Sequence, residues 1–168
     1  MYLLRTIALV FSLSFLLAQD EMTIEDLYQR NGLFYAPGQD STFSGNVIGN
    51  WENGIKKLDY TYKDGKPDAK WSTWYNNGQP EEEKEYQMGI QSGMHKQWYR
   101  NGQQKYERTY KEGIHDGKWS EWYENGQAMV EGSFLDGRPD GTWTYWYPNA
   151  QKREEGNPVS SDSTGLAF

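Results

Sequence analysis

The sequence predicts an all-β fold, an elongated single-layer antiparallel meander of about five β-hairpin repeats of 24 residues each. The pentapeptide WYENG at 122–126 returns as WYNNG at 74–78, WYRNG at 98–102 and WYPNA at 146–150. Aromatic and polar residues alternate on both sides of each copy, which is typical of strands. The chain has 168 residues with 8 Trp and 13 Tyr but few aliphatic residues, so any core is thin and built from rings.

The first 18 residues, MYLLRTIALVFSLSFLLA, are interpreted as a secretory signal peptide (1–18). One basic residue, Arg5, precedes an apolar run from Ile7 to Leu17 that is too short to span a bilayer. Ala18 is a small residue suited to cleavage, and polar residues follow at once. We therefore expect export to the periplasm or the extracellular space after cleavage near Ala18. An uncleaved membrane anchor is the alternative.

Three further segments follow the signal peptide. Residues 19–32 are expected to form an N-terminal lead-in, in which TIEDLYQ (23–29) could begin a short helix, because Thr23 and Asp26 have the spacing of a capping box. The hairpin repeats are expected over 33–156. Small and polar residues dominate 157–168, which predicts a flexible C-terminal tail.

Each repeat is predicted to be two strands joined by a two-residue type I′ turn at Asn-Gly, since both central residues of that turn need a positive φ. With this turn, Trp122 would face Met129, and the Trp119 indole would cover Gly132. FLDGRPDG (134–141) is expected to form a longer connection to the next repeat. The predicted turn residues are Asn53, Gly54, Asn77, Gly78, Asn101, Gly102, Asn125 and Gly126.

Strand alternation assigns the side chains to two faces. The more apolar face is expected to carry Trp119, Tyr123, Ala128, Val130 and Phe134. The opposite face is expected to carry an acidic column, in which Lys96 pairs with Glu107, and basic side chains over its indoles. It also carries the candidate interaction surface: Trp74, Trp98, Trp122 and Trp146.

The unit DGKWSEWYENGQ, followed by a Glu, an aromatic residue and Asp-Gly, resembles the bacterial variant of the MORN repeat. Residues 30–47 look like the lead-in segment of such proteins, so the resemblance covers about residues 30–156. It implies a meander of hairpins that acts as an interaction scaffold, and many bacterial relatives carry a YwqK-type antitoxin label. The sequence departs from the pattern at Ala69, His95 and Asn149-Ala150, where we expect local irregularity.

Composition and motifs exclude several function classes. The net charge of −7, which loss of Arg5 lowers to −8, argues against nucleic acid and against membrane binding by the mature chain. The chain has no Cys and only two His, and no catalytic motif, metal-ligand spacing or cofactor loop can be read. His95 is expected to be a ring of the sheet, and His115 to be exposed. We therefore expect no enzyme, no cofactor and no metal.

The function expected from the sequence is that of an exported, non-enzymatic repeat scaffold that binds an unknown protein partner through its aromatic-rich sheet faces. Two alternatives stay open. Rows of Trp and Tyr could stack on sugar rings, which would make the chain a glycan- or cell-envelope-binding module. The second alternative is that the chain is an antitoxin-like protein that neutralises a partner, although the signal peptide argues against this cytosolic role.

Overall fold

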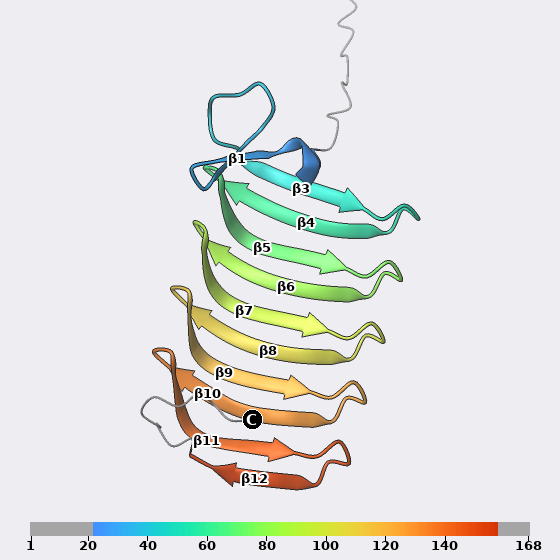
Figure 1. Ribbon diagram of the computed structural model, residues 1–168, viewed down its shortest axis with the longest axis vertical. Coiled ribbons are helices and arrows are strands. Elements are labelled where there is room, and N and C mark those ends of the chain that lie inside the picture. The colour runs from blue at the N-terminus through green and yellow to red at the C-terminus, as the bar shows by residue number, and fades with distance from the viewer. Residues whose placement is uncertain (1–21, 158–168) are drawn as a thin grey trace, which may run out of the picture.

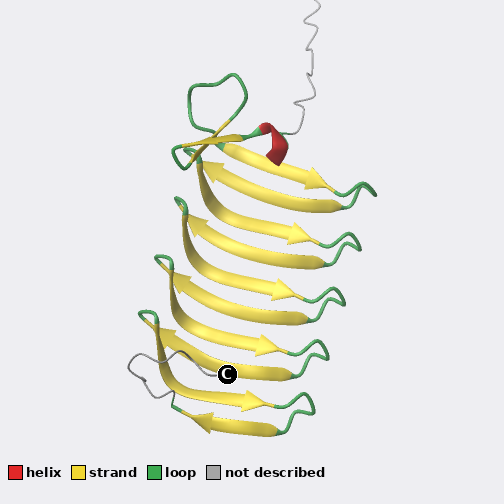
Figure 2. Ribbon diagram, viewed as in Figure 1, coloured by secondary structure: helices red, strands yellow, loops and turns green. Residues whose placement is uncertain are grey.

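The computed structural model describes residues 22–157 and confirms the all-β meander of hairpins (Figure 1). Ten strands follow one another in chain order across one open antiparallel sheet, with β3 at one edge and β12 at the other. The strands form a single layer, and the turns lie along its two sides (Figure 2). The predicted signal peptide lies outside the described residues, as do residues 158–168 of the predicted tail.

Five hairpins, each closed by an Asn-Gly or Asn-Ala turn, make up the sheet. Their strands are β3 (Gly45–Asn50) with β4 (Lys56–Lys63), β5 (Lys66–Trp74) with β6 (Pro80–Gln87), β7 (Ile90–Trp98) with β8 (Gln104–Lys111), β9 (Ile114–Trp122) with β10 (Ala128–Leu135), and β11 (Arg138–Trp146) with β12 (Lys152–Gly156). The 24-residue period of the sequence is therefore the period of one hairpin.

From here on, the lead-in means all described residues before β3. It contains a 3-10 helix, η1 (Ile24–Asp26), and a small hairpin of β1 (Tyr28–Arg30) and β2 (Leu33–Tyr35). The main-chain N–H and the hydroxyl of Thr23 both donate to the Asp26 carboxylate, at 2.9 and 2.7 Å, so the predicted capping box is present. The helix is a single turn, shorter than expected over 23–29, because the chain enters β1 at Tyr28.

The compact core of the molecule lies where the lead-in covers one face of the sheet. Val47, Leu58 and Tyr62 are buried there, with exposed fractions of 0%, 7% and 2%. Apolar side chains of the lead-in pack against them, including Phe34 and Phe43. Both faces of a single-layer sheet are open to solvent, and here the lead-in supplies the cover that buries Val47 and Tyr62 almost completely.

The Asn-Gly turns differ from the predicted type I′ form. Gly126 has a φ of 82°, but Asn125 is not in the left-handed region. The Gly126 N–H donates to the Tyr123 carbonyl and the Tyr123 N–H to the Gln127 carbonyl, both at 2.8 Å. This is a three-residue loop, a type I turn followed by a glycine bulge. In the last hairpin Ala150 takes the glycine position with a φ of 64°.

Type I′ turns occur instead at the opposite side of the sheet. Asp136 and Gly137 have φ values of 48° and 77°, and the flanking residues Leu135 and Arg138 pair directly. The longer connection expected over 134–141 is therefore wrong, because β10 and β11 continue up to a two-residue turn. The equivalent turns are Asp64-Gly65, Met88-Gly89 and Glu112-Gly113.

The register of each hairpin shifts by one residue close to the Asn-Gly turn. The predicted pair of Trp119 with Gly132 is confirmed, but Trp122 pairs with Ala128, not Met129. Paired residues share a face, so the assignment of Ala128 to the more apolar face was wrong. Met129 is the extra residue of a bulge, which turns its side chain toward that face.

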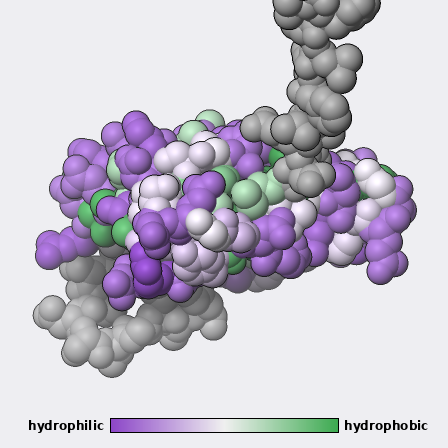
Figure 3. Space-filling model, turned by 90° about the horizontal axis from the view of Figure 1, so that it is seen from above, coloured by the Kyte–Doolittle hydropathy of each residue, from purple (hydrophilic) through white to green (hydrophobic). Residues whose placement is uncertain are grey.

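No helix within residues 22–157 is long and apolar enough to cross a membrane. Seen from the end that carries the lead-in, the molecule shows a mostly hydrophilic surface with small hydrophobic patches (Figure 3). This end of the molecule therefore offers no large apolar area, and the two faces of the sheet are described below.

Candidate functional site

The recurring pentapeptide joins each hairpin to the next. The hydroxyl of Tyr75 donates to the Trp98 carbonyl at 2.8 Å, 23 residues further on. The Asn77 side chain donates to the Arg100 carbonyl at 2.9 Å and accepts from the Gln79 N–H at 3.1 Å. The same bonds recur in the following repeats. The conformation of the turn therefore depends on a neighbouring repeat as well as on its own residues.

The tryptophan face is the face of the sheet that carries Trp74, Trp98, Trp122 and Trp146. These four residues end β5, β7, β9 and β11, so their indoles form a column beside the Asn-Gly turns. Each is half-buried. Equivalent rings are two strands apart, roughly 10 Å. The column therefore presents partly exposed aromatic surface at regular spacing on a stiff backbone.

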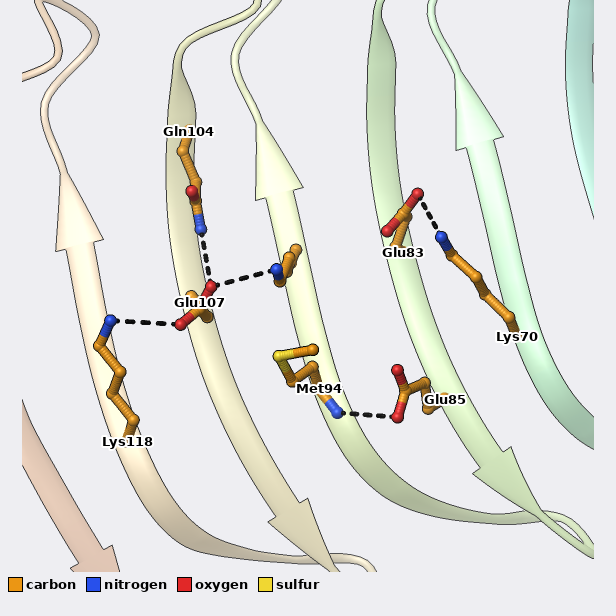
Figure 4. A network of polar contacts seen from close by, with 8 residues as sticks. Lys70, Glu83, Glu85, Met94, Gln104, Glu107 and Lys118 are labelled. Carbon is orange, nitrogen blue, oxygen red and sulfur yellow. Dashed lines mark hydrogen bonds and ion pairs between the residues drawn. The ribbon is translucent and has the colours of Figure 1, made fainter.

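The same face carries a band of ion pairs, part of which is shown in Figure 4. Lys70 lies 2.7 Å from Glu83, and Glu107 lies 3.3 Å from both Lys96 and Lys118. Burial alone would raise the pKa of Glu107, but hydrogen bonds from the two lysines outweigh it and lower that pKa. Asp59 and Glu155 pair with Lys56 and Lys152, whereas Glu131 forms no ion pair within residues 22–157, so most of the acidic column is locally paired, as predicted. No group of three metal-ligating side chains occurs within the same residues.

The basic side chains expected over the indoles of Trp98 and Trp146 lie elsewhere. Lys105 is 5.7 Å from the centroid of the Tyr99 ring, and Arg153 is 5.2 Å from that of Tyr145. Both occupy the bulge position of Met129, which turns them away from the tryptophan face. Within the described residues, only Trp74 of the column has a basic side chain over its indole, with Lys56 Nζ 5.2 Å from the ring centroid.

The opposite face, which we call the groove face, contains a groove of about 540 Å³ near the C-terminal end of the sheet. Five of the residues that line it are aromatic. The groove is lined by Arg108, Trp119, Glu121, Tyr123, Met129, Val130, Phe134, Pro139, Trp143, Tyr145 and Arg153. Sequence reasoning assigned the more apolar residues to this face but did not predict a groove, whose shape depends on the bulges.

Gly132 explains why the groove forms at this place. The equivalent positions hold Tyr60, Lys84 and Arg108 in the three earlier hairpins and Gly156 in the last one, so among the five hairpins the side chain is missing only in the two at this end of the sheet. The Trp143 indole lies over the bare backbone, and a Cβ on Gly132 would be 2.3 Å from its Cδ2 atom. Trp119, which was predicted to cover Gly132, belongs to the preceding strand. Its indole stacks on Arg108 instead, and the guanidinium carbon lies 4.0 Å from the ring centroid.

A polar cluster occupies the middle of the groove face. The His95 Nε2 atom is 2.9 Å from a Glu82 oxygen and 2.8 Å from the Tyr106 hydroxyl. Burial alone would raise the pKa of Glu82, but hydrogen bonds from His95 and from Lys84 lower it to about 2. His95 is 8% exposed, so it replaces a tryptophan as a buried ring held by hydrogen bonds.

His115 is half-buried, so its predicted exposure was wrong. It belongs to β9 and packs between Tyr110 and Phe134, at 4.4 and 5.1 Å between ring centroids. Burial lowers its pKa, and the nearby Arg108 lowers it further. The neutral ring therefore acts as one more aromatic side chain of the groove face.

Comparison with known proteins supports the repeat architecture. A family model described as MORN repeat variant matches residues 67–88, 91–112 and 116–136, which correspond to the three central hairpins. The search of curated proteins finds no match. Three of the five hairpins are therefore similar to this repeat, and a sheet of stacked hairpins is an architecture suited to a repeat scaffold.

Proposed function

We propose that this protein is an exported, non-enzymatic scaffold that binds another protein through its aromatic sheet faces, with the tryptophan face as the principal contact surface. The observation that carries the proposal is the column of four half-buried indoles, Trp74 to Trp146, beside a band of ion pairs. An aromatic strip bordered by charged side chains has the composition of a protein interface, whose centre is apolar and whose rim is polar.

The stiffness of the sheet favours binding. The Tyr and Asn side chains of successive turns tie the hairpins together, so the indoles keep their spacing before a partner arrives. A surface that is already ordered loses little conformational entropy on association. Aromatic side chains on such a surface give large contact areas at a low entropic cost, which is why they are frequent among residues that dominate binding.

Glycan binding is the alternative that the geometry also supports. Four indoles in a row could stack on sugar rings spaced along a cell-envelope polysaccharide. A screen of soluble glycans against the mature protein separates the two ideas, because a saturable glycan ligand would favour this alternative. An antitoxin-like role would place the protein beside a cytosolic toxin, and the expected export argues against it.

Export is tested by intact-mass measurement of the protein recovered from its own cells. The apolar run and Ala18 predict a mature chain that begins at or near Gln19. A product that retains Met1 in the membrane fraction would overturn export, and the scaffold would then act at the membrane surface.

Binding is tested by affinity capture from an envelope extract with the wild-type protein and a Trp122→Ala variant. The wild type is expected to retain a partner in near-stoichiometric amount, and Trp122→Ala to lose most of it while its denaturant midpoint shows that the fold persists. Equal capture by both proteins would remove the tryptophan face from the proposal.

A further inference from the structure

The two ends of the groove face differ in one respect. Near the N-terminal end, the lead-in covers the sheet, and the rings of Phe34 and Phe43 pack on Tyr62 with centroid distances of 4.9 and 5.8 Å. Tyr62 is 2% exposed as a result. Phe134 occupies the equivalent position three repeats later and lines the groove. No segment within residues 22–157 covers it in the way that the lead-in covers Tyr62.

The covered end thus shows which side chains can pack against the ring at this position of the repeat. Phenyl rings of an irregular segment lie against the ring at the position of Tyr62, held by main-chain bonds to the turn at Gly65. The open end offers the same kind of surface: Phe134, Trp119 and Trp143 pack together with centroid distances of 5.1 Å from Phe134 to each indole. A volume of about 540 Å³ accommodates one or two aromatic side chains.

The charged side chains of the groove set a second requirement for its ligand. Arg108 is already neutralised, because its guanidinium lies 2.5 Å from the Glu121 carboxylate. Arg153, at the rim, stacks on Tyr145 and forms no ion pair with any residue between 22 and 157. The groove therefore has one cation available for a carboxylate, next to an apolar pocket for a ring.

We propose that this groove is a second binding site, separate from the tryptophan face, for an extended peptide segment of another protein that carries an aromatic side chain next to an acidic one. The ring takes the place on Phe134 that the lead-in phenylalanines take on Tyr62, and the carboxylate pairs with Arg153. The site does not depend on the tryptophan face, so either can fail without the other.

The probe is a terminally blocked, fluorescently labelled peptide, Ser-Gly-Asp-Phe-Ser-Phe-Asp-Gly-Ser, titrated into the mature protein and followed by fluorescence anisotropy. Replacing both Phe by Ala should abolish saturable binding. Replacing both Asp by Asn should weaken it about tenfold, which corresponds to about 1.4 kcal/mol, because the charged pair with Arg153 is lost. Binding of all three peptides with one affinity would overturn the proposal.

The matched protein variants are Arg153→Glu and Lys105→Glu. Lys105 holds the same bulge position two repeats earlier, and it does not line the groove. Arg153→Glu should weaken binding of the Asp peptide at least tenfold and should reverse the preference, so that the Asn peptide binds more tightly than the Asp peptide, whereas Lys105→Glu should stay within twofold of wild type. Equal effects of both variants would show nonspecific attraction by surface charge and would overturn the site.

Self-association is the competing use of this face. Sedimentation velocity of the mature protein should give a monomer, with the groove open to the peptide. A stable dimer that excludes the peptide and dissociates in Arg153→Glu would show that the groove binds a second copy of the chain and would overturn the proposal. The capture experiment with Trp122→Ala is unaffected by either result.

Discussion

The hydroxyl of Tyr123 donates a hydrogen bond of 2.9 Å to the main-chain carbonyl of Trp146, 23 residues further along the chain. This bond joins the fourth hairpin to the fifth, and its equivalents join the earlier ones. The recurring WYxNG sequence therefore carries two roles: its Trp lies in the column of the tryptophan face, and its Tyr and Asn hold that column in register.

Tyr123→Phe should lower the free energy of unfolding by about 1 kcal/mol, the usual net worth of one such hydrogen bond. Tyr147→Phe is the control, because Tyr147 is 49% exposed and its hydroxyl makes no hydrogen bond within residues 22–157. Denaturant midpoints of both variants check this. Equal midpoints for the two would mean that the tyrosine ladder contributes nothing to joining the repeats.

Ala150→Gly should leave stability unchanged or raise it by up to about 1 kcal/mol, because Ala150 is held at a φ of 64°, where a Cβ is strained. Gly126→Val should do the opposite and cost about 1–3 kcal/mol, because a β-branched residue resists the φ of 82° at that position. Thermal melting of both variants provides the measurement. A melting temperature of Gly126→Val equal to that of wild type would contradict the observed turn.

The two tryptophans of β9 should respond differently to removal. Trp119→Ala should cost about 3 kcal/mol or more, since its ring packs on Phe134 and stacks on Arg108. Trp122→Ala should cost about 1 kcal/mol, because its ring lies on the less enclosed tryptophan face. Chemical denaturation of both variants decides this. If Trp122→Ala unfolds as readily as Trp119→Ala, the tryptophan column is structural and not a contact surface.

Stability should fall in acid because of Glu82. Its pKa is about 2 in the folded protein and 4.5 in an unfolded chain, so its contribution is complete above pH 4.5 and is lost as the pH falls toward 2. Glu82→Gln should lower the denaturant midpoint above pH 4.5 and reduce its pH dependence between 4.5 and about 2. The same acid profile in variant and wild type would show that other carboxyl groups cause the loss.

The repeat, its length and most strand pairings could be predicted, because the hairpin is copied without insertion and aromatic residues alternate within it. The types of the turns could not be predicted from the sequence. Asn-Gly favours type I′ in isolation, but here the Asn125 side chain donates to the Pro148 carbonyl of the next repeat and accepts from the Gln127 N–H. Bonds between repeats thus outweigh the local preference of the dipeptide.

The tryptophan column was identified from the sequence, whereas the groove was not. A period of two assigns faces correctly only while a strand is regular, and the bulge at Met129 turns one side chain per hairpin to the other face. The groove further depends on Trp143 crossing over Gly132, a contact between two hairpins. Such contacts follow from the register between repeats, which alternation within one repeat does not specify.

The most direct test of the proposed function is hydroxyl-radical footprinting of the mature protein, free and with its captured partner. We predict that the partner lowers the oxidation of Trp74, Trp98, Trp122 and Trp146 together, while Tyr147 at the last turn keeps its reactivity. Protection confined to the turns or to β12, with unchanged oxidation of the four tryptophans, would contradict it.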